Sequence, residues 1–513
     1  MRKQKLFLLI FLSITLYSAA FGRTIFNEGE KSTYKVQSFI ITDYGAVGDG
    51  KTICTEFINH AIKECYKNGG GQVYFPPGIY ISGTIILKSN VELYLERGST
   101  LLASTNHSDF PRMKQPKYRS QKDPGGWYAL IYGEGVSNIG IRGFGLINGQ
   151  GKLQKFRPEL LGGDRDGRPR NILLISCSDV RIENVKMKNS GIWNQHYLNC
   201  EDVIIDGVQV YNHSNRNNDA IDIDGCRRFV MSNSIVDSDD DGITLKSTGA
   251  ALCEDITISN CVVSSFCNGI KAGTESTGGF KNITISNCII KPSRSKEIVR
   301  VNNYSLGITG ISLEIVDGGI MEGVTIDNVT IEGTQCPLYI RLGNRARKHT
   351  SNAKEPGVGI MKNIAISNLV AYNSGNFCSS ITSFTGHYIE NVSLNNIQLF
   401  NIGGLQKGDY IADINEIKED EKGYPQPTNW KELPSSALFI RHAKNVMIQG
   451  LLMGSDAIDP RVPIIANDVE GLSIKNTRVT KNNTSDTFFQ GKDVTVFDVE
   501  KPLGWKAKVT NIQ

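Results

Sequence analysis

The sequence predicts an all-β fold, a single-stranded right-handed parallel β-helix (a solenoid) with an N-terminal capping helix. Three observations predict it. A short apolar unit with an Asn or Gly corner recurs along the chain, glycines (52) far outnumber prolines (16), and long amphipathic helical patterns are scarce. The recurring units begin at Val136, Cys177, Cys200, Cys253, Phe280, Met321, Met361, Ile389 and Ala443.

Each unit joins two short, alternating, β-branched runs through an Asn or Gly, as in CEDITISNCVVSS from Cys253. The steps from Cys177 to Cys200 and from Cys253 to Phe280 are 23 and 27 residues, a period typical of solenoids. Such a coil cannot bury its inner face alone, so neighbouring coils stack through parallel strands. The L-x-x-L-x-L spacing of leucine-rich repeats is missing, and propeller blades need longer antiparallel units.

The sequence also predicts a cap at the N-terminal end of the solenoid and one long loop that interrupts the repeat. Apolar residues at helical spacing in TEFINHAIKECYKNGGGQ, residues 55–72, predict a helix that covers the open N-terminal edge. Residues 414–434 are charged and carry prolines, which predicts a loop over one face. We see no domain boundary, so residues 23–513 are predicted to form a single β-helix domain.

The first 22 residues, MRKQKLFLLIFLSITLYSAAFG, have the pattern of a secretory signal peptide. A basic start precedes an apolar stretch, and the small residues Ala20 and Gly22 stand before the predicted cut. The apolar stretch is too short to span a bilayer comfortably, which disfavours a membrane anchor. We therefore expect an exported protein, periplasmic or secreted.

Charge and cysteine content narrow the function classes. The formal charge is +4, and three of the positive charges lie in the predicted leader, so no strong field favours nucleic acid or membrane binding. Eleven cysteines in an exported chain make disulfides one interpretation. We favour buried, stacked thiols, because free Cys packs as a small hydrophobe. Six cysteines recur beside predicted strand starts: Cys177, Cys200, Cys226, Cys253, Cys261 and Cys288. No CxxC occurs, which disfavours zinc.

An acidic run, DSDDD over 237–241, leads directly into the strand-like sequence GITLKS. Carboxylates a few ångström apart repel by about 1 kcal/mol or more, and partial burial raises the pKa of at least one of them. Such a run at the edge of the core lowers stability, which indicates a functional site.

Four successive strands align on a small residue followed by Ile, and the alignment places the acids. The aligned segments are DAIDID from Asp219, DGITLKS from Asp241, NGIKAGT from Asn268 and TGISLE from Thr309. The predicted inward row is Ile221, Ile243, Ile270 and Ile311. The predicted outward rows are Asp222, Thr244, Lys271 and Ser312, then Asp224, Lys246, Gly273 and Glu314. Because coils lie ~4.8 Å apart, Asp219 and Asp241 become neighbours. We expect the turn before Gly242 to bring Asp240 to the same side.

Three carboxylates on one outer face suit glycoside hydrolysis. One acid protonates the leaving oxygen, and another carboxylate activates water. A separation of roughly 6.5–9.5 Å between them gives inversion. Lys246 and Lys271 are candidates to bind hydroxyls or a sugar carboxylate. Two other interpretations are a calcium site and an Asx-rich turn ladder.

At these residues the sequence resembles the polygalacturonase-like glycoside hydrolases of family 28, in the pectin lyase-like β-helix superfamily. The resemblance extends from ITDYGAVGDGKT near the N-terminus to GYPQPTNWKELPSSALFIRHAKNV. The Asn-Thr-Asp motif of the family is matched by Asn217-Asn218-Asp219, and its Gly-Asp-Asp by Asp239-Asp240-Asp241. The resemblance implies that Asp240 is the general acid and that Asp219 and Asp241 hold and activate water.

Two family motifs differ in this sequence. The Gly-His-Gly motif falls on Cys267-Asn268-Gly269, and the Arg-Ile-Lys motif, which binds the galacturonate carboxylate, falls on Ser312-Leu313-Glu314. The second change removes a charge-assisted contact. Either Lys271, or Arg341 with Arg345 and Arg347 nearby, replaces it, or the subsite takes a neutral sugar such as rhamnose, held by Glu314. The residues assigned to substrate binding are Lys246, Lys271, Asn268, Asp222, Glu314 and Arg341.

Three further residues, Glu275, His196 and Trp193, have less specific interpretations. Glu275 is an outward candidate without an assigned role, and His196 is interpreted as a satisfied residue of a ladder. Trp193 either stacks on a sugar ring or packs under a loop.

The leading interpretation is an exported, inverting hydrolase of pectin-type, galacturonan- or rhamnogalacturonan-like polysaccharides or oligosaccharides, with no metal and no cofactor. The second is a polysaccharide lyase whose acids bind calcium and whose base is Lys271 or Arg341. The third is a non-catalytic carbohydrate-binding solenoid. We expect a monomer that has no membrane span and binds no nucleic acid.

Overall fold

The structure is a computed structural model that describes residues 37–154, 167–297, 306–480, 482–505 and 508–512. The predicted leader, residues 1–22, lies outside the described residues. Residues Ser38–Gln513 group as one compact unit, separate from Met1–Gln37. Within the described part of the chain, no helix has the length and apolar character needed to cross a membrane.

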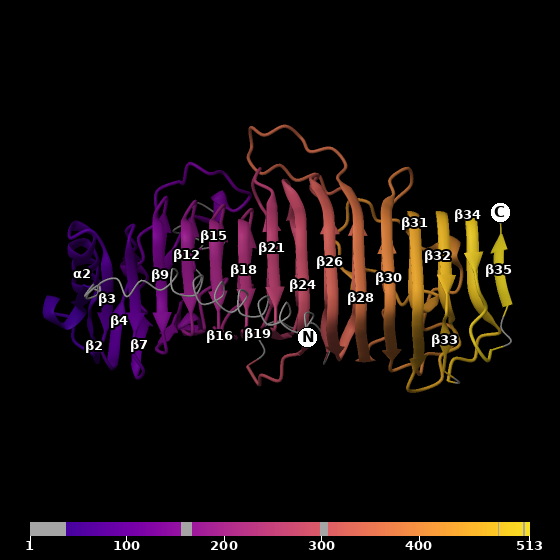
Figure 1. Cartoon of the computed structure of the whole chain (residues 1–513), viewed down its shortest axis with the longest axis horizontal. Coiled ribbons are helices and arrows are strands. Elements are labelled where there is room, and N and C mark those ends of the chain that lie inside the picture. The colour runs from indigo at the N-terminus through magenta and orange to yellow at the C-terminus, as the bar shows by residue number, and fades with distance from the viewer. Residues whose placement is uncertain (1–36, 155–166, 298–305, 481, 506–507, 513) are drawn as a thin grey trace, which may run out of the picture. The chain divides into compact units, whose positions relative to one another are not determined.

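The unit Ser38–Gln513 is a parallel β-helix, as predicted. In the described residues its strands stack coil on coil into three columns, and all paired strands of these columns run parallel (Figure 1). Crossovers between parallel strands favour the right-handed form. The first column contains β5 (Ile85–Ile86), β8 (Ala129–Glu134), β11 (Arg170–Ile175), β14 (Gln195–Leu198), β17 (Ile221–Asp224), β20 (Ile243–Ser247), β23 (Asn268–Ser276), β25 (Gly307–Ile315), β27 (Thr334–Leu342), β29 (Ser379–Thr382) and β35 (Lys508–Ile512).

The other two columns complete each coil. The second contains β1 (Ser38–Ile40), β3 (Gly71–Phe75), β6 (Val91–Leu95), β9 (Ser137–Gly143), β12 (Ser178–Glu183), β15 (Glu201–Asp206), β18 (Arg227–Ser232) and β21 (Cys253–Ser259). The third contains β2 (Asp49–Ile53), β4 (Gly78–Ser82), β7 (Ser99–Ala103), β10 (Leu146–Asn148), β13 (Lys186–Lys188), β16 (Gln209–Asn212), β19 (Ile235–Ser238), β22 (Val262–Ser265) and β33 (Arg478–Val479).

Later strands are long enough to bend from one column into the next. Four of them run through the second and third columns: β24 (Gly279–Pro292), β26 (Ile320–Glu332), β28 (Ile360–Ser374) and β30 (Ile389–Asn401). Three more begin in the first column: β31 (Ser435–Ser455), β32 (Val462–Lys475) and β34 (Thr487–Val499).

The predicted capping helix is α2 (Thr55–Lys67). It buries Ile58, Ala61, Ile62 and Cys65 against the first coils. Its polar face stays exposed, so the helix covers the apolar end of the solenoid that β1 and β3 would otherwise present to water.

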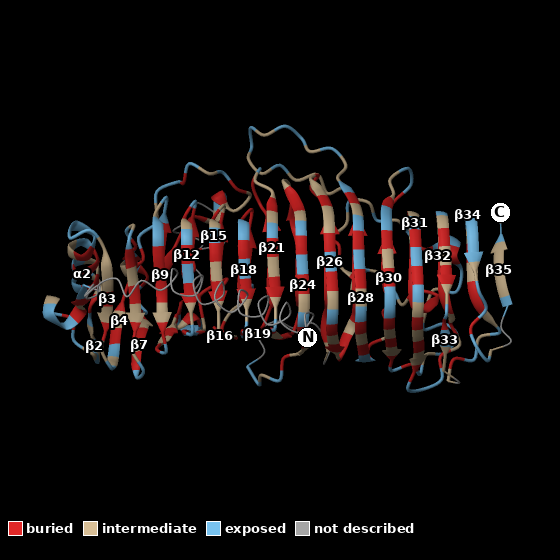
Figure 2. Ribbon diagram, in the orientation of Figure 1, coloured by how far each residue is buried: buried red, intermediate tan, exposed pale blue. Residues whose placement is uncertain are grey.

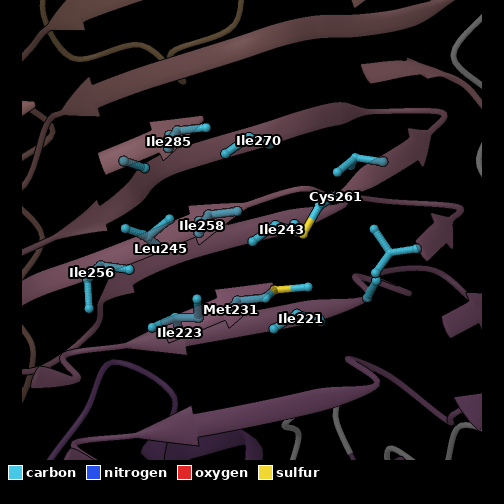
Figure 3. Packing of buried hydrophobic residues seen from close by; sticks show 14 of the residues in the cluster. Ile221, Ile223, Met231, Ile243, Leu245, Ile256, Ile258, Cys261, Ile270 and Ile285 are labelled. Carbon is cyan, nitrogen blue, oxygen red and sulfur yellow. The ribbon is translucent and has the colours of Figure 1, made fainter. Parts of the chain in front are cut away.

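The interior is a stack of aliphatic side chains, and the predicted inward row is confirmed. Ile221 pairs with Ile243, Ile243 with Ile270, and Ile270 with Ile311. Figure 3 shows the first three of these side chains one above another with Ile223, Leu245 and Cys261. Buried and exposed residues alternate along strands such as β24 and β28 (Figure 2), because one strand face packs on this core.

The Asn corners of the repeat form a ladder at the surface. Asn391 Nδ2 donates to Asn363 Oδ1 at 2.8 Å, and Asn445 Nδ2 donates to Asn391 Oδ1 at 3.1 Å. These asparagines have φ values of 54–60°, a left-handed conformation that Asn tolerates better than most residues. The local conformation therefore explains why Asn or Gly recurs in every unit.

All eleven cysteines lie in described residues and are buried free thiols, as favoured above. Cys200 and Cys226 donate to backbone carbonyls of the preceding coil at 3.4 and 3.2 Å. Burial raises the pKa of the Cys200 thiol well above its ordinary value, so these thiols pack as neutral core groups.

Candidate active site

The three predicted catalytic acids lie where strands of the first column begin. Asp219 precedes β17, and Asp240 and Asp241 form the bend between β19 and β20. The Ala220 amide donates to the Asp241 carbonyl at 3.0 Å, which places Asp219 and Asp241 on adjoining coils. Side-chain oxygens of Asp240 and Asp241 lie within 4.8 Å of each other. The bend thus brings both to one side, as the turn before Gly242 was expected to do.

The bend that carries Asp240 is held by hydroxyl groups. Ser238 Oγ and Ser265 Oγ donate to the Asp240 carbonyl at 2.9 and 2.5 Å. Asn217 Nδ2 lies 3.4 Å from Asp240 Oδ2. Asp240 is 7% exposed, more than Asp219 at 3% and Asp241 at 4%, so its carboxyl is the most accessible of the three.

Asn268, which stands where the family has histidine, belongs to a short ladder. Its Nδ2 donates to Asp241 Oδ1 at 2.6 Å, and its Oδ1 accepts from Thr309 Oγ1 at 2.7 Å. The asparagine therefore fixes the orientation of the Asp241 carboxylate. Because both ends of its amide are engaged, Asn268 acts on the site through Asp241.

Lys246 lies at the centre of the acids. Its Nζ is 3.7 Å from Asp219 Oδ2, 3.5 Å from Asp222 Oδ1 and 3.6 Å from Glu275 Oε2. Burial opposes its charge, but Glu275, Asp222 and Asp219 raise the Lys246 pKa well above its ordinary value. Lys246 is therefore a permanent cation in this cluster.

Lys271 lies on the next coil, where it pairs with Thr244 in the strand register. Its Nζ lies 3.4 Å from Asp241 Oδ2, 3.9 Å from Glu314 Oε2 and 3.4 Å from the Tyr424 hydroxyl. Burial opposes its charge, yet Asp241 and Glu314 raise the Lys271 pKa well above its ordinary value. The cation lost from position 314 thus has a counterpart on the adjoining coil.

Crowded carboxyls in the site retain protons. Burial, followed by the charges of Asp222 and Asp240, raises the pKa of Asp219 well above its ordinary value. Burial raises the pKa of Asp222 to about 7, against the opposing effect of Lys246. The Asp222 side chain is fully buried, and its Oδ1 lies 3.5 Å from Lys246 Nζ.

An irregularity in the pairing of β20 with β23 places Glu275 in the site. The register between β20 and β23 shifts after Leu245. Gly273 has a φ of 125°, and a Cβ there would lie 2.8 Å from Cβ of Glu314, so glycine is required beside that glutamate. Beyond it, Glu275 contacts Lys122 at 3.0 Å and Lys246 at 3.6 Å. Burial alone would raise the Glu275 pKa, but Lys122, Lys246 and Arg347 lower it well below its ordinary value.

Arg341, which was assigned to substrate binding, is held by backbone carbonyls. It pairs with Glu314 in the strand register, as expected, but its guanidinium donates to the carbonyls of Ser383, Glu419 and Asp420 at 2.6–3.1 Å. Arg341 is 3% exposed. It anchors the loop 414–434 through Glu419 and Asp420, and its assignment to substrate binding stays a prediction.

Two arginines that follow Arg341 lie nearer the acids. Arg345 stands over the Tyr424 ring at 5.2 Å. Arg347 pairs with Asp317 at 2.5 Å and reaches to 3.8 Å from Glu275. The side chains noted only as neighbours of Arg341 thus belong to the site.

His196 is a fully buried structural residue. Its Nε2 lies 2.9 Å from Asp224 Oδ2, and Asp224 also accepts from the amide and hydroxyl of Thr248 at 2.8 and 2.6 Å. Burial lowers the His196 pKa to about 4, so the ring is neutral. Its edge-to-face contact with Trp193, at 4.9 Å between centroids, fixes that indole.

Two loops contribute residues that the strand pattern did not single out. Residues 110–126, between β7 and β8, carry Lys122, and residues 414–434 carry Tyr424. Only residues 414–434 were predicted to form a loop, and no periodicity gives the direction in which a loop side chain points.

The group formed by Asp240, Asp241 and Cys267 bears on the calcium interpretation. Ligand atoms of Asp240, Asp241 and Cys267 lie within 4.8 Å of one another. Calcium takes about six to eight oxygen ligands, whereas this group includes a thiol and has the Lys271 ammonium 3.4 Å from Asp241. The residues present do not fit calcium.

Comparisons with known proteins identify the family to which the chain belongs. A model of the family described as glycosyl hydrolases family 28 matches residues 96–418. A protein named Probable polygalacturonase from Vitis vinifera is 33% identical over 223 residues, which cover 42% of this chain and 45% of that protein. An exo-poly-alpha-D-galacturonosidase from Dickeya chrysanthemi is 27% identical over 40% of this chain and 41% of its own length. The chain thus spans less than half the length of these curated relatives.

Solved structures share the fold at low identity. The hyperthermoactive exopolygalacturonase from Thermotoga maritima superposes with a TM-score of 0.61 at 20% identity, over 81% of this chain and 92% of that one. The family 28 exopolygalacturonase of Yersinia enterocolitica gives 0.62 at 19% identity, over 87% and 78%. At these identities the likeness establishes a common β-helix.

Proposed function

Because the chain belongs to family 28 of the glycosyl hydrolases, we propose that it hydrolyses O-glycosyl bonds in pectin-type, uronate-containing polysaccharides or oligosaccharides. The observation that carries the proposal is the meeting of Asp219, Asp240 and Asp241 on adjoining coils beside two buried lysines. This set supplies an acid, a base and cations for an anionic sugar in one place.

In the proposed reaction Asp240 delivers a proton to the leaving oxygen, and Asp219 and Asp241 hold the water. Burial, followed by the charges of neighbouring acids, raises the pKa values of Asp219 and Asp222, which keeps a proton in the site near neutral pH. Asp240 and Asp241 approach to within 4.8 Å, shorter than the roughly 6.5–9.5 Å of an inverting pair. The proposed acid and base are therefore not this pair alone, and we propose that Asp219 shares the water with Asp241, with inversion as the stereochemical outcome.

Two cations support the choice of an acidic sugar. Lys246 and Lys271 stand on opposite sides of the acids, and both stay protonated. Lys271 lies one coil before the positions at which the family carries its Arg and Lys. A carboxylate bound there gains a charge-assisted hydrogen bond, so galacturonate remains the favoured unit.

The lyase alternative lacks a base. A lyase needs a neutral amine or another group that takes a proton, whereas the Lys271 pKa is raised well above its ordinary value. Arg341 is engaged by backbone carbonyls, and the acid cluster does not fit calcium. These observations favour hydrolysis over elimination.

We further propose that residues 23–513 act as one exported, monomeric catalytic domain. The sequence pattern of residues 1–22 supports export. Fractionation of cells that express the full chain tests it: cleaved protein is expected outside the cytoplasm, and uncleaved cytoplasmic protein would contradict export.

Sugar release from homogalacturonan, rhamnogalacturonan and neutral glycans tests the function. We expect wild type to release reducing ends from a uronate-containing glycan, with and without chelator, and Asp240→Asn to release almost none. A wild type that cleaves none of the panel would contradict the hydrolase. Binding of these glycans by both proteins without cleavage would instead indicate a carbohydrate-binding solenoid.

A further inference from the structure

The loop 414–434 brings Tyr424 to the candidate active site from a distant part of the solenoid. The Tyr424 hydroxyl lies 3.4 Å from Lys271 Nζ, and the Arg345 guanidinium carbon lies 5.2 Å from the centroid of its ring. Lys271 belongs to β23, whereas the loop leads into β31, and β25, β27 and β29 lie between these two strands in the first column. Because the loop leaves the ladder of strands, its backbone needs other hydrogen-bond partners.

Arginine side chains of the first column supply partners for the backbone of the loop. Arg341 Nη2 donates to the carbonyls of Glu419 and Asp420 at 2.6 and 3.1 Å. Arg441 Nη1 donates to the carbonyl of Ile417 at 2.9 Å. The backbone is therefore held at residues 417–420, just before the segment that carries the tyrosine.

The carboxylate of Glu419 adds a side-chain anchor at the same place. Its Oε2 accepts from the Thr385 amide at 2.9 Å, and its Oε1 accepts from the Thr385 hydroxyl at 2.8 Å. The same Oε1 lies 3.0 Å from His442 Nε2 and 3.4 Å from Arg441 Nη2. Burial opposes ionisation, yet the hydrogen bonds from Thr385 and His442 lower the Glu419 pKa to about 2. The carboxylate thus stays charged in weakly acidic solution and accepts charge-assisted bonds.

His442 is fixed from its other side by a second carboxylate. Its Nδ1 lies 2.6 Å from Oδ2 of Asp468, which belongs to β32. The residue is buried and has a φ of 55°, an uncommon conformation that persists where the surroundings hold it. When both carboxylates are ionised, only the imidazolium form donates from both ring nitrogens. The imidazolium ring then links Glu419 of the loop to the body of the solenoid.

We propose that Glu419 is a positioning residue for the proposed hydrolysis, because it holds the loop 414–434 where Tyr424 contacts Lys271. The proposal rests on the proposed function, since the loop is expected to help bind the acidic substrate. Without this anchor, Tyr424 is expected to leave the site while Asp219, Asp240 and Asp241 keep their places on the coils.

Trypsin measures whether the loop is held, and it needs no substrate. The exposed lysines of the loop are Lys418, Lys422 and Lys431. We expect Glu419→Gln to be cut in the loop about tenfold faster than wild type, because the uncharged amide turns a donor toward other donors. Glu416→Gln, at an exposed position of the same loop, is the matched control. Equal rates of cutting in Glu419→Gln and wild type would overturn the proposal.

Steady-state kinetics tests whether the anchor matters for the substrate. Glu419→Gln should raise KM for acidic oligomers about fivefold, with a smaller change in kcat, because a binding contact is lost and the acids are untouched. Tyr424→Phe should raise KM in the wild-type background but no further in Glu419→Gln, whose loop no longer brings the hydroxyl to Lys271. An equal rise in both backgrounds, or a rise in neither, would overturn the proposal.

Thr385→Ala gives the same test if Glu419→Gln lowers the thermal midpoint. Thr385 is exposed, and the change removes one hydroxyl donor to Glu419, so faster tryptic cutting and a raised KM are expected at smaller size. Wild-type values for both would contradict the anchor. A wild type that cleaves no glycan would contradict the proposed function, whereas the tryptic rates of the variants would still decide whether Glu419 holds the loop.

Discussion

The acid cluster has two flanks, and each flank places a buried lysine among carboxylates with different neighbours. On the Trp193 flank, Lys246 is paired with Asp219, Asp222 and Glu275, and a fixed loop forms a walled cavity beside it. On the other flank, Lys271 stands between Asp241 and Glu314 beneath Tyr424, which is 44% exposed. We call the first the closed flank, because the loop 110–126 covers it, and the second the open flank, because Tyr424 above it is exposed, although both lysines are themselves buried.

The shared feature is a buried lysine accompanied by an acid whose pKa is about 7. Asp222 plays this part on the first flank and Glu314 on the second. Each acid offsets part of the lysine charge when ionised and little when protonated.

The largest expected effect comes from Asp240, which both flanks share. Asp240→Asn keeps the shape but cannot donate the acid proton, so we expect kcat to fall about 10³-fold. Circular dichroism and the thermal midpoint should stay close to wild type. A variant with more than a tenth of wild-type kcat would exclude Asp240 as the general acid.

The next largest effect is on the pH dependence of the free energy of unfolding, through Glu314 of the second flank. Burial raises the Glu314 pKa from 4.5 to about 7, so the folded state binds this proton more tightly than the unfolded state. The stability it contributes is present below about pH 4.5 and is lost as pH rises through about 7. Its size is on the order of 3 kcal/mol.

Urea unfolding of wild type and Glu314→Gln across pH 4.5–8 measures this loss. The variant mimics the protonated acid, so it should match wild type at the acidic end and be more stable at the alkaline end. Glu355→Gln, at an exposed position, is the control. Parallel curves for wild type and Glu314→Gln would show that Glu314 does not titrate in this range.

Removing the lysine of the open flank is expected to act on binding. Lys271→Gln should raise KM for acidic substrate about tenfold, with a smaller change in kcat. Steady-state kinetics on uronate and neutral oligomers measures it, with Lys354→Gln as the exposed control. An equal loss on both substrates would mean that Lys271 acts through Asp241 and does not contact a carboxylate.

The smallest effect is expected from the Tyr424 hydroxyl. It lies 3.4 Å from Lys271 Nζ and 3.5 Å from Thr274 Oγ1. Tyr424→Phe removes one neutral group at a partly exposed position, so KM should rise about two- to fivefold. No change would mean that the loop 414–434 adds no contact on the open flank.

The strand positions of the site were predictable because they follow a period. The row from Asp222 to Ser312 occupies the predicted register, and Asp219 and Asp241 are neighbours as expected. Alternation fixes which side chains face outward, and stacking fixes which of them meet. The position of Asp240 depended in addition on the turn before Gly242, and the roles of the three acids came from the family resemblance.

The contacts of Arg341 and the position of Tyr424 could not be predicted from the period of the repeat. The register correctly placed Arg341 beside Glu314, but the carbonyls of the loop 414–434 engage its guanidinium. Those carbonyls and Tyr424 come from a segment whose path depends on contacts distant in sequence. Lys122 was missed for the same reason, since a loop has no alternation that orients its side chains.

The most direct test of hydrolysis is the origin of the oxygen at the new chain end. The wild-type protein should be incubated with its uronate substrate in water labelled with oxygen-18, and the masses of the products should be measured by mass spectrometry. Hydrolysis predicts saturated products with one heavy oxygen at each new reducing end, in the presence of chelator as well. Unlabelled, unsaturated products that absorb in the near ultraviolet would contradict the roles given to Asp219, Asp240 and Asp241.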